Sequence, residues 1–221
     1  YMLHGKEPDP LEGKMMDQCL ILHAEHSFNA STFTARVVAS TLSTCYCSIA
    51  AAIGALFGSL HGGANEKVMA MVESIGSVEK APGYVNQALD EHKKIMGMGH
   101  RVYKAQDPRA TVMEEFLDTL SKKKDDSINY EILKEVRKVF RKRMEEKGKP
   151  IYANVDYFSG GVYTLMGIQS SLFTPIFAMS RAAGWLAHIL EQRSDNRLFR
   201  PKALYSGYEH REFVSIEERG R

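Results

Sequence analysis

Three short segments of this 221-residue chain carry residue types suited to acid–base chemistry. In the first, His61 follows a long uncharged stretch and precedes Gly62, Gly63 and an amphipathic segment. A histidine at a helix N-terminus lies at the positive end of the helix dipole, which disfavours the imidazolium form. A neutral imidazole in that position can donate a hydrogen bond to a carbonyl or enolate oxygen. The alternative is a turn histidine without a chemical role.

The second segment places His100 directly after a Gly-x-Gly sequence at residues 97–99. Three cationic residues follow it within nine positions: Arg101, Lys104 and Arg109. The planar guanidinium group suits bidentate binding of a carboxylate or phosphate. By itself the pattern is also typical of a plain basic turn.

The third segment surrounds Asp156 with apolar and aromatic neighbours, among them Tyr157 and Phe158. An unpaired carboxylate is costly in such surroundings. Desolvation raises the basicity of the carboxylate, which suits it to abstracting a proton. The alternative is an aspartate that only stabilises the first turn of a helix. Together, two histidines and one carboxylate indicate an enzyme that abstracts a proton next to a carbonyl and binds an anionic partner.

Other candidate residues carry weaker signals. His23 and His26 are three positions apart beside Glu25, but as a metal pair they lack a third ligand, so packing or substrate contact is favoured. Arg181 lies inside an apolar segment, where its charge needs a partner in the protein or in a ligand. Arg200 is expected at the surface unless another subunit covers it.

The segments that must position these residues have helical periodicity. Apolar residues recur at helical spacing over 12–26, 65–75, 84–95, 108–120, 128–144 and 171–190. Asp107-Pro108 is a helix-start signal. The stretch 37–65 has no charged residue and is long enough to span a bilayer, but its Ser, Thr, Ala and Gly content favours a buried helix that includes residues 37–57. The sequence predicts an all-α protein.

The composition excludes several classes of protein. The chain is 44% apolar and 25% charged, which excludes a disordered chain, and its Gly, Pro and Cys counts exclude collagen-like and disulfide-scaffold proteins. The net charge of +2 indicates no general attraction to nucleic acid or membranes. The basic segment 134–149 is interpreted as a solvated helix face, with a polyanion-binding face as the alternative. Cys19, Cys45 and Cys47 are expected to be reduced core thiols, and with no secretory signal we expect a cytoplasmic location.

At these residues the sequence resembles the citrate synthase family, which includes the 2-methylcitrate synthases. The resemblance covers essentially the whole chain. The motifs that carry it occur in family order: His23-Ala24-Glu25-His26-x-x-Asn29, Leu60-His61-Gly62-Gly63-Ala64-Asn65, Gly97-x-Gly99-His100-Arg101-Val102-Tyr103-x-x-x-Asp107-Pro108-Arg109, Asn154-Val155-Asp156-x-x-Ser159-Gly160, Ser180-Arg181-Ala182-x-Gly184 and Arg200-Pro201.

The resemblance implies a two-domain all-α fold with the active site in the cleft between the domains. Residues 1–62 would belong to the large domain, residues 63–167 to the small domain, and residues 168–221 to the large domain and a C-terminal tail. Members of the family are longer, so this chain resembles their C-terminal portion, and the N-terminal part of the large domain is expected to be absent from it.

The resemblance also implies an activity, the condensation of acetyl-CoA with oxaloacetate to give citrate and CoA in the tricarboxylic acid cycle. Asp156 would remove the methyl proton, His61 would bind the thioester oxygen, and His100 would polarise the ketone. Five residues would bind oxaloacetate: His26, Arg109, Phe177, Arg181 and, from a neighbouring subunit of a homodimer, Arg200. Seven residues would contact CoA: Ile95, Gly97, Met98, Gly99, Lys104, Lys149 and Asn154. No metal, further cofactor, nucleic acid or membrane is expected.

Three alternatives remain open at this point. A 2-methylcitrate synthase would use propionyl-CoA, and one methylene is worth only about 1–3 kcal/mol in a hydrophobic pocket. A citryl-CoA lyase would run the reverse cleavage. A non-catalytic helical scaffold would have no reason to bring His61, His100 and Asp156 to one cleft.

Overall fold

A computed structural model describes residues 1–100, 102–103 and 105–220, and this part of the chain is all-α without a strand, as predicted. Nine α-helices lie within it: α1 (Pro10–Ala24), α2 (Ala30–Ser40), α3 (Cys45–Leu56), α4 (Ala64–Ile75), α5 (Ala81–Asp90), α6 (Pro108–Lys124), α7 (Ile128–Glu146), α8 (Asp156–Leu165) and α9 (Phe173–Ser194). Two short 3₁₀ helices, Val78–Lys80 and Ser170–Leu172, precede α5 and α9.

Side-chain caps explain where several helices begin. Asp9 accepts hydrogen bonds from the first turn of α1, and Asn29 does the same for α2. Thr44 caps α3, and the predicted Asp107 cap of α6 is confirmed, with proline at the first helical position of both α1 and α6. Local chemistry therefore sets the start of these four helices, whereas α4, α8 and α9 begin without a side-chain cap.

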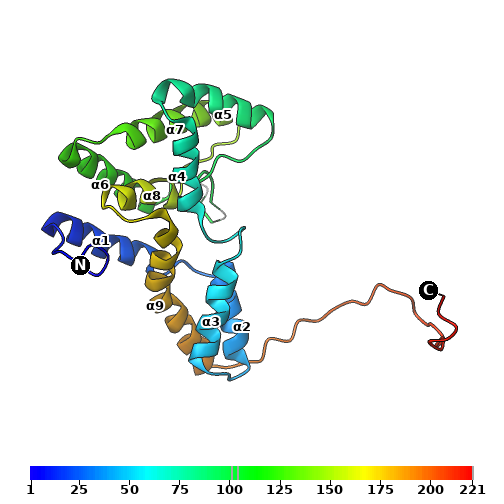
Figure 1. Cartoon of the computed structure of the whole chain (residues 1–221). Coiled ribbons are helices and arrows are strands. Elements are labelled where there is room, and N and C mark those ends of the chain that lie inside the picture. Colours follow the sequence, from blue (N-terminus) through cyan, green and yellow to red (C-terminus); the bar gives the residue numbers. More distant parts are fainter. Residues whose placement is uncertain (101, 104, 221) are drawn as a thin grey trace.

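Each of the two groups of helices seen in Figure 1 is held together by a hydrophobic core. The larger core is formed by α4–α8 together with Met15 and Cys19 of α1 and Phe173 and Ile176 of α9. The smaller core joins α2, α3 and the second half of α9 through residues such as Trp185. Helix α9 runs through both cores and connects the two parts of the molecule.

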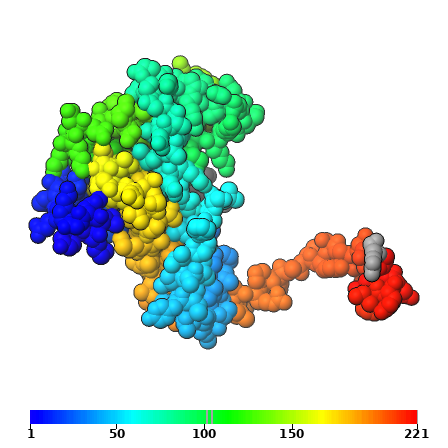
Figure 2. Space-filling view, viewed as in Figure 1, coloured from blue at the N-terminus to red at the C-terminus, as the bar shows by residue number. Residues whose placement is uncertain are grey.

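The predicted domain boundaries at residues 62 and 167 stay a prediction. Helix α1 and the start of α9, which the prediction assigns to the large domain, share a core with α4–α8. Asn196 and Phe199 still contact Ser40 of α2, and beyond them the chain extends away from the helical body (Figure 2). Within the part of the chain that is described, no helix is long and apolar enough to cross a membrane.

Some details of the sequence prediction are wrong. The expected helix over 37–57 is broken at residues 41–44, where Leu42 has a positive φ of 63° and Thr44 caps a new helix. Helix α5 ends at Asp90, earlier than expected, and His92 has a φ of 57°. Helix α8 was not predicted. All three cysteines are free, but Cys47 is exposed and is therefore not a core thiol.

Candidate functional site

His61 and Asp156 lie at one small cavity, although they are far apart in the sequence. The cavity has a volume of about 30 Å³ and is formed where the turn before α4, the start of α8 and the start of α9 meet. Thr174 and Phe177 of α9 also line it. The fold therefore brings an imidazole and a carboxylate to the same space, where both can act on one small group.

The His61 ring is held by the N-terminus of α2. Its Nε2 accepts a hydrogen bond from the Ser31 backbone N–H at 3.1 Å and lies 2.8 Å from Ser31 Oγ. A backbone N–H can only donate, so Nε2 must carry a lone pair and the proton of the neutral ring is on Nδ1. Burial, together with the Arg181 charge, lowers the pKa of His61. The helix N-terminus that meets the ring is that of α2, rather than that of the following helix as the sequence suggested.

His100 is held in the opposite tautomer. Its Nδ1 accepts backbone N–H groups from Val102 at 3.0 Å and Tyr103 at 3.1 Å, which places the proton of the neutral ring on Nε2, 3.5 Å from Arg109 Nη2. Burial lowers the pKa of His100, and the charges of His26 and Arg109 lower it further. The neutral ring can thus donate from Nε2 to an oxygen.

Asp156 is the first residue of α8, so it does occupy a first-turn position. Part of the residue's surface remains accessible, but protein atoms closely surround the carboxyl group. Burial raises the pKa of Asp156, while the charges of Arg109 and Arg181 oppose that rise. The carboxylate is therefore a stronger base than an exposed aspartate.

Backbone pairing connects the segment before His100 to the segment before Asp156. Met98 and Ala153 form an isolated antiparallel bridge. Asn154 donates its backbone N–H to Gly97 O and its side-chain amide to Gly99 O, both at 2.9 Å. Gly97 has a φ of +75°, and a Cβ there would lie 2.8 Å from the Tyr157 ring. These contacts hold His100 and Asp156 in fixed relation.

Two arginines make the neighbouring region attractive to an anion. Asp107 fixes the Arg109 guanidinium through contacts of 2.8 and 3.0 Å. The Arg181 side chain is buried and donates Nε to His23 O at 2.7 Å, and no ion pair found among the described residues includes it. Burial and the charge of Arg109 lower the pKa of Arg181 to about 10. Asp107 already compensates the charge of Arg109, so an anionic ligand would chiefly neutralise that of Arg181.

Aromatic rings complete this region. His26 packs edge-on against His100, with ring centroids 4.9 Å apart, and also against Tyr103 at 5.4 Å. Phe177 lies 4.6 Å beneath the Arg181 guanidinium. The structure thus places the predicted oxaloacetate-binding residues His26, Arg109, Phe177 and Arg181 around the two histidines and Asp156.

The remaining predicted site residues lie in different surroundings. Arg200 is exposed on the extended tail, where its nearest recorded partner is Pro201 O at 3.5 Å. Lys149 is exposed after α7, and Ile95 is buried. Lys104 lies outside the described residues. Within this chain, Arg200 is therefore not part of the site.

The sequence analysis missed four groups that the structure adds to the site. Ser31 orients His61, Trp185 donates its indole N–H to Ser31 Oγ at 3.2 Å, Asp107 fixes Arg109, and Thr174 lines the cavity. Ser31 follows the capping residue Asn29, so a helix-start pattern could have drawn attention to it. Nothing in the sequence pattern points to Trp185 or Thr174.

These observations agree with the comparisons to known proteins. A protein-family model described as "Citrate synthase, C-terminal domain" matches residues 1–202. The chain belongs to the citrate synthase family. A citrate synthase 2 of Bacillus subtilis is 52% identical over 219 residues, which cover 99% of this chain and 58% of that protein. A 2-methylcitrate synthase of Shewanella oneidensis is 43% identical, with 99% and 57% covered.

A solved citrate synthase structure has the same fold. The ternary complex of citrate synthase from Thermoplasma acidophilum with carboxymethyl coenzyme A and oxaloacetate has a TM-score of 0.90 and 40% sequence identity. The structural match includes 97% of this chain and 57% of the Thermoplasma acidophilum chain. The chain thus spans rather more than half the length of the citrate synthase relatives that it matches.

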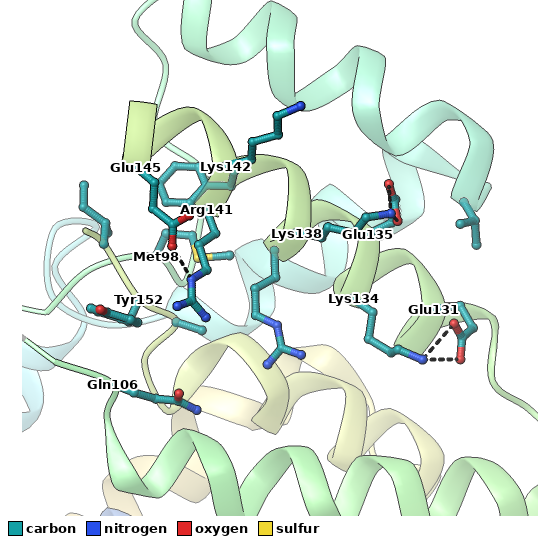
Figure 3. A pocket seen from close by; sticks show the side chains of 15 residues that line it. Met98, Gln106, Glu131, Lys134, Glu135, Lys138, Arg141, Lys142, Glu145 and Tyr152 are labelled. Carbon is teal, nitrogen blue, oxygen red and sulfur yellow. Dashed lines mark hydrogen bonds and ion pairs between the residues drawn. The ribbon is translucent and has the colours of Figure 1, made fainter. Parts of the chain in front are cut away.

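A larger groove of about 760 Å³ lies beside α7 (Figure 3), and neither His61, His100 nor Asp156 lines it. Met98 and Tyr152 line one side of it. Three ion pairs join residues three or four positions apart on α7: Lys134–Glu131 at 3.1 Å, Lys138–Glu135 at 2.9 Å and Arg141–Glu145 at 2.7 Å. The positive charges of α7 are thus largely compensated by neighbouring glutamates. This favours the interpretation of α7 as a solvated face over that of a polyanion-binding face.

Proposed function

We propose that this chain carries the catalytic residues of a citrate synthase, an acyltransferase that condenses acetyl-CoA with oxaloacetate and water to give citrate and CoA. The observation that carries the proposal is the cavity shared by His61 and Asp156. A base and a hydrogen-bond donor at one small space are what proton abstraction next to a carbonyl requires. The paired arginines nearby suit a dicarboxylate acceptor.

Each residue has one role in this mechanism. Asp156 takes a proton from the methyl group of acetyl-CoA, while the His61 Nδ1–H donates to the thioester oxygen and stabilises the enol. His100 donates from Nε2 to the ketone of oxaloacetate. The enol carbon forms a bond to that ketone carbon, and His100 protonates the alkoxide, giving citryl-CoA. Water then cleaves the thioester C–S bond, which releases citrate and CoA.

His26, Arg109 and Arg181 hold the carboxylates of oxaloacetate in this proposal, and Phe177 packs beside them. The segment 95–99, Asn154 and Lys149 contact CoA, together with Lys104. We further propose that residues 63–167 form a small domain that closes on the rest of the molecule. The reaction belongs to the tricarboxylic acid cycle, and a cytoplasmic location remains our expectation.

A thiol-release assay with oxaloacetate and acetyl-CoA tests the proposed activity. It should be run on this chain and on a chimaera in which the N-terminal region of the Bacillus subtilis relative precedes it. We expect release of CoA, and Asp156→Asn should lower turnover by about 10²-fold or more, since general-base catalysis contributes roughly 10²–10⁴. Turnover close to wild type in that variant would rule out Asp156 as the base.

Arg200 is proposed to act in the site of a neighbouring subunit of a homodimer. The support is its position on a tail that extends away from its own site (Figure 1). Mixing Arg200→Ala and Asp156→Asn chimaeras under exchange conditions tests this role. Hetero-dimers would contain one intact site, so activity should recover towards about a quarter of wild type. No recovery despite verified exchange would show that Arg200 does not act across an interface.

A further inference from the structure

The loop that joins α1 to α2 carries His26 and has a strained backbone. Ser27, the residue after His26, has a positive φ of 57°. This left-handed conformation is unfavourable for any residue that has a Cβ. The Ser27 side chain is exposed, so its own packing cannot hold the conformation. Other groups must therefore hold this part of the loop.

The Glu25 carboxylate holds the strained residue. Its Oε1 accepts the backbone N–H of Ser27 and lies 2.9 Å from Nε2 of His188 on α9. Although burial opposes the effect, these two hydrogen bonds lower the pKa of Glu25, so the side chain is a charged acceptor at neutral pH. Hydrogen bonds to a charged group are stronger than those between neutral groups. One carboxylate thus ties the loop to α9.

His188 is fixed in the tautomer that can donate to Glu25. Arg36 Nη1 lies 3.3 Å from His188 Nδ1, and a guanidinium can only donate, so Nδ1 carries a lone pair and the proton is on Nε2. Arg36 also forms an ion pair with Glu191. Phe28 packs edge-on against His188, with ring centroids 5.7 Å apart, and the Arg36 guanidinium lies 4.9 Å from the Phe28 ring. Helices α2 and α9 thus present a fixed donor to the carboxylate.

The elements on both sides of the loop are closely packed. Helix α9 contacts both α1 and α2 (Figure 1). At the end of α1, a Cβ on Gly184 would lie 2.2 Å from Ala24 O, and at the start of α2 the Asn29 side chain caps the helix. Between these two anchored ends, His26 lies edge-on to His100 with ring centroids 4.9 Å apart. The position of the His26 ring therefore depends on the backbone of residues 25–27.

We propose that Glu25 and His188 are positioning residues for oxaloacetate, because they fix the backbone that carries His26. This inference rests on the proposed function, in which His26 binds oxaloacetate beside His100. Glu25 does not touch the substrate. It accepts the Ser27 N–H and so maintains the left-handed conformation that keeps His26 against His100. Without the carboxylate, Ser27 returns to a negative φ and the His26 ring loses its position.

Two variants of Ser27 isolate the backbone conformation, because the side chain is exposed and both variants keep the N–H. Glycine adopts a positive φ without strain, whereas a β-branched valine strongly disfavours it. Ser27→Gly should therefore leave the KM for oxaloacetate within about threefold of the wild type. Ser27→Val should raise that KM about tenfold or more.

Variants of the two partners test the hydrogen bonds. Glu25→Ala removes the acceptor and should raise the KM for oxaloacetate about tenfold, whereas Glu25→Gln keeps Oε1 and should stay within about threefold of the wild type. His188→Phe keeps a ring beside Phe28 but removes the donor, so the KM should rise about threefold. Glu131→Ala on α7 is the matched control, because Glu131 is also an ion-paired glutamate of similar exposure, and it should match the wild type.

The measurement is thiol release, with each substrate varied at a saturating concentration of the other, in this chain and in the chimaera. Calorimetric titration with oxaloacetate gives its Kd independently of turnover. A merely structural role of Glu25 would lower kcat through loss of folded enzyme and leave the KM for oxaloacetate unchanged. The positioning role raises the KM and the Kd for oxaloacetate and leaves the KM for acetyl-CoA within about twofold.

The failure of this inference differs from the failure of the proposed function. If the wild type neither binds oxaloacetate nor releases thiol in either background, both fail. If it binds oxaloacetate but releases no thiol, the proposed function fails alone, and the Kd values of the variants decide this inference. If Glu25→Ala keeps the KM and the Kd of the wild type, Glu25 does not position His26. Equal KM values for Ser27→Gly and Ser27→Val would overturn the role of the left-handed conformation.

Discussion

Acidification should destabilise the protein through His23, a buried residue in the last turn of α1. The side chain is 1% exposed, and its Nδ1 lies 2.8 Å from Cys19 O, so Nδ1 carries the proton of the neutral ring. Its Nε2 has no hydrogen-bond partner within the described part of the chain. Burial lowers the pKa of His23 from 6.5 to about 4, and the charges of Arg109 and Arg181 add to this effect.

The sign and the size of the destabilisation follow from the two pKa values. Between pH 6.5 and pH 4, the unfolded chain binds a proton at His23 that the folded chain does not bind. The free energy of unfolding must therefore fall as the pH falls through that window. From pH 7 to pH 5, a pKa shift of this size corresponds to a loss of about 2 kcal/mol.

Urea unfolding at pH 7 and pH 5 measures this loss. His23→Gln keeps an amide donor for Cys19 O but does not titrate, so the variant should lose about 2 kcal/mol less than the wild type on acidification. The lowered pKa values of His26, His61 and His100 affect both proteins and cancel in the difference. His210→Gln on the exposed tail is the control. Equal losses in wild type and His23→Gln would refute the reasoning.

Three further changes test other parts of the structure. Asp156→Asn should raise the melting temperature at pH 7 even though it lowers turnover, because the raised pKa means that the ionised carboxylate destabilises the folded state above that pKa. Trp185→Phe keeps a ring in the smaller core but removes the indole donor of the His61 network, so thiol release should fall about tenfold. Gly184→Ala should cost about 2 kcal/mol or more in urea unfolding, since its Cβ would lie 2.2 Å from Ala24 O, whereas Gly54→Ala, in open space on α3, should be neutral or stabilising.

The helices that the sequence predicted well are those with local signals. Asp107 caps α6 as expected because a cap depends on residues adjacent in the sequence. Helix α8 was missed because Gly160 and Gly161 lower its helix propensity. In the structure those glycines allow close packing, and a Cβ on Gly160 would lie 2.8 Å from Asn65 O. That requirement comes from a helix far away in the sequence, so propensity alone could not reveal it.

The candidate site was predictable mainly in its titratable residues, to which the family resemblance added Phe177. His61, His100 and Asp156 could be selected because their side chains are chemically distinctive and occur in family motifs. The groups that set the histidine tautomers are backbone N–H groups of Ser31, Val102 and Tyr103, which nearly every residue possesses. Only the three-dimensional fold determines which backbone groups meet which ring.

The opposite tautomers of the two histidines determine which groups at the site can donate a proton and which can accept one. A backbone N–H points at Nε2 of His61 and at Nδ1 of His100, so protonating either ring would place one N–H against another. This arrangement and burial both favour the neutral imidazole. At neutral pH both rings can then donate to substrate oxygens, from Nδ1 of His61 and from Nε2 of His100, but neither is a ready acceptor. Asp156 is left as the group that can take a proton, and its raised pKa makes it better at that task.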